Sequence, residues 1–277
     1  MTSSFDKAAA ALRRPALQPA PSLAALGVPL MEACLGGGLR KGALHEVFAK
    51  DGASAAAGLG FATGLALRVA QKQRLLWVRQ DFAAREYGEI SALGLLELGL
   101  DPNRVILVKA PDALEVLRVL QEALSCAGLG AVIAEIYGEP KILDLTASRR
   151  LGLAAAKKNV TAFLLRHRAA FLPSAAETRW IVAPARSQPA AVWGRPRLDI
   201  ALIRNRHGLT GQFTLEWKDG VFHDAQTSSR AVVSAPADRP RAAPGDRPVK
   251  PALGAGREEQ QRFALDGHGR ESRAARS

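Results

Sequence analysis

Residues 43–71 read ALHEVFAKDGASAAAGLGFATGLALRVAQ. An apolar run at 43–49 is followed by a loop of small residues, and the loop leads into an apolar helix expected over Ala55–Gln71. A strand, a small-residue loop and a helix in this order form the layout of a phosphate-binding loop, in which backbone N–H groups at a helix N-terminus hold phosphate oxygens. The stretch therefore predicts an α/β fold.

The alternation of apolar strands and helices continues to residue 166. Strands that are apolar throughout are typical of a mostly parallel sheet with helices on both faces. The last two strand-like segments are joined by the turn HGLTG at 207–211, which predicts a C-terminal antiparallel hairpin. The predicted strands cover 43–49, 74–80, 104–110, 130–137, 160–166, 178–185, 197–206 and 211–220, and the predicted helices cover 55–71, 90–98, 112–126 (with Asp112 as N-cap) and 145–158.

Composition divides the chain of 277 residues into three expected parts. Residues 1–27 contain a predicted helix over Phe5–Arg14 and a proline-containing linker. Residues 28–225 hold the alternating α/β core. Residues 226–277 are rich in Ala, Pro, Arg and Gly and lack a core-forming period, which predicts a basic, disordered tail.

The chain is basic, with a formal net charge of +12. Residues 149–206 hold 12 Lys and Arg but only two acidic residues, Glu177 and Asp199. A concentrated basic field favours a polyanionic partner, with nucleic acid as the first candidate. A basic, solvated surface without a partner remains the alternative.

Three further classes are disfavoured. No uninterrupted run of about 18 apolar residues occurs, so we expect no membrane span, and residues 1–22 lack the apolar core of a secretion signal. Cys34 and Cys126 lie far apart among apolar neighbours, which indicates free thiols in a reducing cytoplasm rather than a metal site. We therefore expect a cytoplasmic protein without a bound metal.

The loop lacks the side chains that phosphate binding requires. Such a loop needs a lysine for the terminal phosphates and a hydroxyl for Mg²⁺, but Ala55 and Ala56 occupy those positions in this register. Each charge-assisted contact is worth about 1.5–3 kcal/mol. Lys50 precedes the loop at the strand end, where we expect it to point elsewhere. Lys50, Asp51 and Gly52, with the two alanines, therefore form a degenerate loop, and no nucleotide cofactor is expected.

Two segments carry a family resemblance. LGGGLRKGALHEVFAKDGASAAAGLGFATGLALRVAQ at 35–71 resembles the start of a RecA-type ATPase core, and RLDIALIRNRHGLTGQFTLEWKDGVF at 197–222 resembles the terminal hairpin of that fold. More closely, about 5–224 resembles the ImuA family of SulA/RecA-like damage-inducible mutagenesis proteins. The motifs are loose: LGGGL, LHEV, the strand end FLLR and the hairpin RNRHGLTG. The resemblance implies a RecA-like fold.

The resemblance also places the positions that catalyse ATP hydrolysis in RecA-type enzymes. The acid that polarises water falls at Asp81, the metal-associated acid at Glu135, and the γ-phosphate-sensing glutamine at Arg166. Two acids without the lysine do not hold ATP–Mg²⁺ in the usual way. The resemblance therefore implies an inactive relative of the ATPases and not an enzyme.

Loops after the later core strands contact single-stranded DNA in RecA-type proteins. Here that region combines arginines with Phe171, Trp180 and Trp193, a chemistry suited to phosphates and stacked bases, although Trp180 also fits a core position. In the tail, Phe263 and Leu265 are two isolated apolar residues typical of a docking motif. The predicted DNA- or partner-binding residues are Arg166, His167, Arg168, Arg179, Arg186, Arg195 and Arg197.

The family resemblance implies an accessory role in bacterial SOS-induced, error-prone translesion DNA synthesis, in the nucleoid-associated cytoplasm. The implied partners are an inactive Y-family-like polymerase homologue of the ImuB type and an error-prone replicative-type DNA polymerase, with RecA and single-stranded DNA as further candidates. Two alternatives stay open at this point. One is a DNA-stimulated ATPase that uses Lys50, Asp81 and Glu135 in new roles, and the other is a SulA-like inhibitor of cell division.

Overall fold

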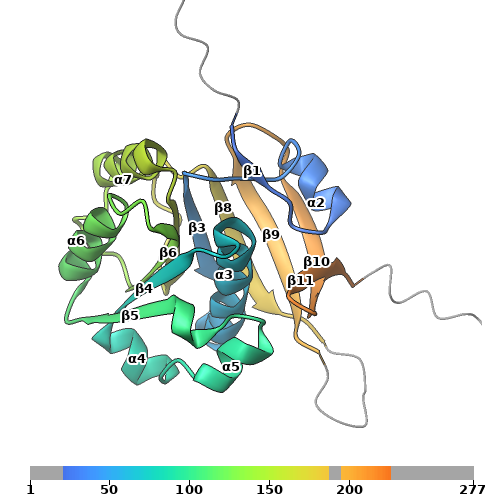
Figure 1. Cartoon of the computed structure of the whole chain (residues 1–277), viewed down its shortest axis with the longest axis horizontal. Coiled ribbons are helices and arrows are strands. Elements are labelled where there is room, and N and C mark those ends of the chain that lie inside the picture. Colours follow the sequence, from blue (N-terminus) through green and yellow to red (C-terminus); the bar gives the residue numbers. More distant parts are fainter. Residues whose placement is uncertain (1–20, 187–194, 226–277) are drawn as a thin grey trace, which may run out of the picture. The chain divides into compact units, whose positions relative to one another are not determined.

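The computed structural model describes residues 21–186 and 195–225. The helix predicted over Phe5–Arg14 and the tail with Phe263 and Leu265 lie outside the described residues, as does Trp193. Figure 1 shows the described part as a central sheet with helices packed on its two faces.

Within the described residues, the main sheet has nine strands in the order β11-β10-β9-β8-β3-β7-β6-β4-β5 (Figure 1). The strands from β8 to β5 in this order run parallel, whereas β9, β10 and β11 are antiparallel to their neighbours. The predicted mostly parallel sheet with a C-terminal antiparallel hairpin is confirmed. The strands are β3 (Leu44–Ala49), β4 (Arg74–Gln80), β5 (Val105–Ala110), β6 (Leu129–Tyr137), β7 (Thr161–His167), β8 (Thr178–Pro184), β9 (Arg197–Asn205), β10 (Gly211–Lys218) and β11 (Val221–Asp224).

Strand β11 was not predicted, although the sequence carries its signal. Asp219 and Gly220 both have positive φ, 53° and 76°, and they connect Lys218 to its cross-strand partner Val221. Asp-Gly with two left-handed residues is the favoured two-residue hairpin turn. The C-terminal unit is therefore a three-stranded antiparallel extension of the sheet.

The helices form a layer on each face of the sheet. α3 (Ala55–Ala70) packs on one face against β3, β6, β7 and β8, whereas α6 (Ala113–Ala123) and α7 (Leu145–Lys158) pack on the other (Figure 1). The two layers bury separate apolar clusters, one around Phe61 and Trp180 and the other around Val116. Helices on both faces were predicted and are confirmed.

The apolar composition of α3 follows from its place in the core. The segment Gly52–Ala70 is long and apolar enough to cross a membrane, yet 67% of its most apolar 18-residue window is buried inside the protein. A β-carbon added at Gly64 would lie 2.5 Å from the Phe222 ring and 2.8 Å from Trp217, so only glycine permits this approach of helix and hairpin. These contacts indicate a core helix.

The ends of α6 and α7, on the second face of the sheet, are determined by local capping contacts. Asp112 accepts a hydrogen bond from the Glu115 N–H at 2.9 Å, which confirms the predicted N-cap of α6. Asp144 caps α7 in the same way, and α7 is followed by Asn159, its C-cap, in the left-handed conformation.

Several short elements differ from the sequence-based expectation. The helix predicted at 90–98 is confirmed as the shorter α5 (Ala92–Glu97), whereas α4 (Asp81–Tyr87) was not predicted. A two-stranded sheet of β1 (Leu23–Ala24) and β2 (Leu39–Arg40) flanks α2 (Pro29–Cys34).

The expected linker up to residue 27 already belongs to the core. Ala24 and Leu26 are buried, and the Glu32 carboxylate accepts hydrogen bonds from the Leu26 and Gly27 N–H groups at 2.6 and 2.8 Å. Within the described residues, the core therefore begins before residue 28, because this segment packs against it.

Candidate functional site

The turn between β3 and α3 is capped by the protein itself. Asp51 accepts hydrogen bonds from the Ser54 backbone N–H at 2.9 Å and from the Ser54 hydroxyl at 2.7 Å. The hydroxyl contact is the main reason that the pKa of Asp51 is lowered. In a phosphate-binding loop the N–H groups at this helix start serve a phosphate. Here the Asp51 carboxylate accepts from one of these N–H groups, that of Ser54, and a phosphate beside it would meet like charge.

The other positions of the degenerate loop offer no replacement for the missing lysine. The Lys50 N–H donates to the Val182 carbonyl at 2.9 Å, which extends the pairing of β3 and β8. Ala55, the lysine position, is buried, whereas Ala56 is exposed. The Arg168 guanidinium lies beside Gly52, with Nη2 3.6 Å from the point that a β-carbon there would occupy. An arginine therefore lies over the loop.

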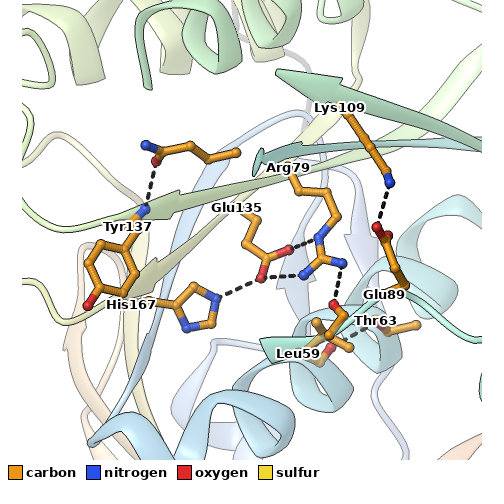
Figure 2. A network of polar contacts seen from close by, with 10 residues as sticks. Leu59, Thr63, Arg79, Glu89, Lys109, Glu135, Tyr137 and His167 are labelled. Atoms are coloured by element: carbon orange, nitrogen blue, oxygen red, sulfur yellow. Dashed lines mark hydrogen bonds and ion pairs between the residues drawn. The ribbon is translucent and has the colours of Figure 1, made fainter. Parts of the chain in front are cut away.

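Glu135 on β6 is the centre of a buried polar network (Figure 2). Arg79 on β4 donates from Nε to one carboxylate oxygen at 2.7 Å and from Nη2 to the other at 3.2 Å. His167 on β7 donates from Nε2 to the carboxylate at 2.9 Å. All three side chains are at most 1% exposed, and Arg79 also donates to the Gly88 carbonyl. The network is closed off from solvent.

The neighbouring charges and hydrogen bonds determine the ionisation state of the Glu135 carboxylate. Burial raises the pKa of Glu135, but the hydrogen bonds from His167 and Arg79 outweigh burial and lower it below its ordinary value. The carboxylate is therefore ionised, and a bidentate arginine neutralises it. A divalent cation would have to displace Arg79 before it reached these oxygens. Asp81 begins α4 and, within the described residues, forms no hydrogen bond or ion pair with the network.

A second buried ion pair lies on the neighbouring strands. Arg179 on β8 donates to Glu46 on β3 at 2.6 Å, and both side chains are buried. The guanidinium groups of Arg179 and Arg166 lie 5.1 and 5.8 Å from the Phe48 ring centroid. Arg166 also donates to the Gly138 carbonyl at 3.2 Å. These arginines stabilise the sheet interior.

The structure separates the seven residues predicted to bind DNA or a partner. Arg166, His167 and Arg179 are 5%, 1% and 6% exposed, so the expectation that they form an accessible basic surface is wrong. They are buried because each donates a hydrogen bond to an acceptor inside the core. Arg195 and Arg197 pair with Glu216 at 3.4 and 3.0 Å. Arg168 and Arg186 are exposed.

The aromatic residues divide in a similar way. Trp180 is fully buried against Phe61, with ring centroids 5.4 Å apart, so its core interpretation is the correct one. Phe171 is 51% exposed and contacts Phe48 edge-on at 4.8 Å. Within the described residues, Phe171 is therefore the accessible member of the predicted stacking set.

Sequence reasoning missed the importance of Arg79 and Glu46. Each lies in an apolar strand directly opposite an oppositely charged residue, because Arg79 pairs in register with Glu135 and Glu46 with Arg179. A lone charge inside an apolar strand was the available signal. The missing information was the strand order, which determines the residue that each charge faces on the adjacent strand.

No family model matches the chain. Protein ImuA of Caulobacter vibrioides strain NA1000 / CB15N is 35% identical over 216 residues, which cover 72% of this chain and 84% of that protein. The chain belongs to the ImuA family. Protein ImuA of strain ATCC 19089 / CIP 103742 / CB 15 matches with the same identity and coverage.

Solved structures place this ImuA family member on a known fold. The crystal structure of the RadB recombinase matches with a TM-score of 0.52 at 18% identity, over 73% of this chain and 99% of that one. At this identity the similarity concerns the fold alone. The RecA-like core expected from the sequence is confirmed.

Proposed function

We propose that this ImuA family member is a non-catalytic accessory protein of damage-induced, error-prone translesion DNA synthesis. The observation that carries the proposal is the Arg79–Glu135–His167 network. In an ATPase of this fold, an acid at the end of this core strand serves a metal ion. Here the equivalent carboxylate is ionised, buried and already neutralised by a guanidinium.

The loop supports the same proposal independently. Asp51 accepts from the Ser54 N–H, one of the groups that would bind phosphate, and the lysine position is a buried alanine, Ala55. Nucleotide binding would need Arg168 to act in place of the lysine, a new metal ligand and removal of a like charge. Each of these changes costs affinity, and together they exceed the roughly 100-fold that about 2.7 kcal/mol represents.

The protein therefore acts through its surfaces. By family membership, we propose a polymerase homologue of the inactive Y-family type and an error-prone replicative-type polymerase as partners. Exposed Arg168 and Arg186 at the carboxyl edge of the sheet support an additional contact with single-stranded DNA. This location corresponds to the loops that contact DNA in RecA-type proteins.

Equilibrium binding of ATP–Mg²⁺ to the full-length protein tests the non-catalytic proposal. We expect no saturable binding up to millimolar ATP, with or without single-stranded DNA. An Ala55→Lys, Ala56→Thr variant restores the loop residues but leaves Asp51 and Arg79 in place, so we expect it not to bind either. Saturable micromolar binding by the wild type would overturn the proposal in favour of an ATPase.

A measurement in cells tests the same proposal with the variant Ala56→Asp. Ala56 is exposed in the first turn of α3, where an acidic side chain is tolerated by the helix but would repel phosphate. In the bacterium that carries this gene, we expect Ala56→Asp to support wild-type frequencies of damage-induced mutation. A fall to the level of a gene deletion, with unchanged protein abundance, would show that the loop binds an anion.

A further inference from the structure

A large groove lies at the amino edge of the sheet, opposite the degenerate loop. It has a volume of about 1000 Å³ and is bordered by α7, by the residues before β3 and β8, and by the end of β9. A second hollow of about 190 Å³ shares four lining residues with it and continues it towards β1 and β2. The shared residues are Pro21, Arg40, Glu177 and His207.

The groove is strongly cationic. Its lining includes Arg40, Lys41, Arg149, Arg204 and Arg206, together with His207, but a single acid, Glu177.

Internal contacts leave most of this charge uncompensated. Glu177 is shared between Arg40 and His207, at 3.4 Å from each. Arg204 and Arg206 donate to the backbone carbonyls of residues 174 and 175, which do not neutralise their charge. Lys41 and Arg149 form no ion pair with an acid of the described residues.

An aliphatic strip runs along the same wall. Leu153 on α7 is 73% exposed, Leu145 is 36% exposed, and Ala156 is exposed between them and the helix end. A β-carbon at Gly152 would meet no atom within 4 Å, so the wall is open at this point. Cations surrounding an exposed leucine form a surface that suits a ligand with both carboxylates and an aliphatic side chain.

We propose that this groove binds an acidic, leucine-containing peptide segment of a partner protein. The proposal rests on the accessory function proposed above and assigns that function a docking site. Carboxylates of the peptide pair with Lys41 and Arg149, and an aliphatic side chain packs on Leu153.

The lining favours a peptide over nucleic acid. Single-stranded DNA is held by cations together with aromatic side chains on which bases stack. The groove lining has cations but contains no Phe, Tyr or Trp. Its apolar component is aliphatic, which suits a leucine and gives a base no stacking partner.

Fluorescence anisotropy with the full-length protein tests the proposal. The probe is a labelled 12-residue peptide made of four Asp-Glu-Leu repeats, measured at low and moderate salt. The comparison probes are an Asp-Glu-Ser repeat, a Lys-Lys-Leu repeat and a labelled dT20. We expect the Asp-Glu-Leu peptide to bind best, the serine peptide to bind more weakly, and affinity to fall as salt rises.

Two pairs of matched variants localise the binding. Lys41→Glu with Arg149→Glu should weaken the peptide about 10-fold or more at low salt, whereas Lys72→Glu with Arg85→Glu changes the net charge equally outside the groove lining. Gly152→Phe fills the open wall, and Gly60→Phe is its control on α3, where an added β-carbon also meets open space. Circular dichroism confirms that each variant is folded.

Each outcome of these binding measurements either supports or overturns the proposal. Loss of peptide binding in both groove variants but in neither control supports the proposal. Groove-dependent binding of dT20 in preference to the peptide overturns it and assigns the groove to nucleic acid. Absence of peptide binding, or equal loss in the control variants, also overturns it. None of these results depends on ATP, so a failure of the non-catalytic proposal is recognised separately.

Discussion

The two edges of the parallel sheet use their charges in opposite ways. At the carboxyl edge, Arg79 is buried and forms an ion pair with the Glu135 carboxylate on the neighbouring strand. At the amino edge, Lys41 and Arg149 face an open groove and form no ion pair with the described acids. The fold therefore uses charge at the carboxyl edge for internal stability and leaves uncompensated charge at the opposite edge. Burial distinguishes a structural cation from one available to a partner.

The largest expected effect comes from breaking the carboxyl-edge network. Arg79→Met leaves Glu135 buried without its guanidinium, so we expect the free energy of unfolding to fall by about 3–5 kcal/mol. Chemical denaturation monitored by circular dichroism measures this. Arg85→Met, at an exposed position on α4, should change the same quantity by less than about 0.5 kcal/mol.

A double variant shows whether the loss comes from the unpaired charge. Combining Arg79→Met with Glu135→Leu removes both charges, so it should recover most of the stability lost by the single variant. If Arg79→Met alone costs less than about 1 kcal/mol, the network does not stabilise the fold and the contrast between the edges fails.

The next effect depends on pH and concerns His45 on β3. Burial lowers the pKa of His45 to about 4, opposed in part by its hydrogen bond to the Arg40 carbonyl. The unfolded chain binds this proton near pH 6.5, whereas the folded chain binds it only near pH 4. The free energy of unfolding should therefore fall as pH drops from 6.5 to 4, by up to about 3 kcal/mol.

The control for this pH dependence of the free energy of unfolding is His45→Gln, because glutamine does not titrate. It should lose this pH dependence between pH 6.5 and 4, measured as the difference in denaturation midpoint from the wild type at each pH. An unchanged slope in the variant would assign the effect to other groups, of which Glu135 titrates in the same direction at lower pH.

The smallest effect is expected at the amino edge. Lys41→Gln with Arg149→Gln removes two unpaired cations, so stability should change by less than about 0.5 kcal/mol, with any gain at low salt disappearing at high salt. Arg204→Met removes a 2.6 Å hydrogen bond to the Ser174 carbonyl and should cost about 0.5–1.5 kcal/mol. A large loss in the double variant would mean that these cations are structural after all.

Local sequence patterns predicted much of the core because they act over one element at a time. Continuous apolar strands such as β3, the cap Asp112 and the helix α7 lie close to where the patterns place them. The Asp-Gly turn before β11 was present but was not used. The helix predicted at 90–98 corresponds to α5, but α4 was missed, because a helix of seven residues is too short to show a clear hydrophobic period.

The site was less predictable than the fold. In the loop, Ala55 and Ala56 stand where a phosphate-binding loop has a lysine and a hydroxyl residue, and the sequence shows this replacement directly. Arg166, His167 and Arg179 were predicted to bind DNA or a partner because basic residues are concentrated in this part of the sequence. Their burial depends on acceptors that lie on other strands, such as Glu46 and Glu135, and those pairings exist only once the strand order is set.

The sequence alone determined the α/β alternation, the hairpin at the C-terminal end of the core and the loss of the phosphate-binding lysine. Each of these follows from residues within a few positions of one another, where spacing defines the geometry. The tertiary structure decided which charges are neutralised and which are free, because Arg79 and Glu135 are 56 residues apart and meet only across paired strands. Likewise, Lys41, Arg149 and Arg206 belong to separate segments, and only folding gathers them at one groove.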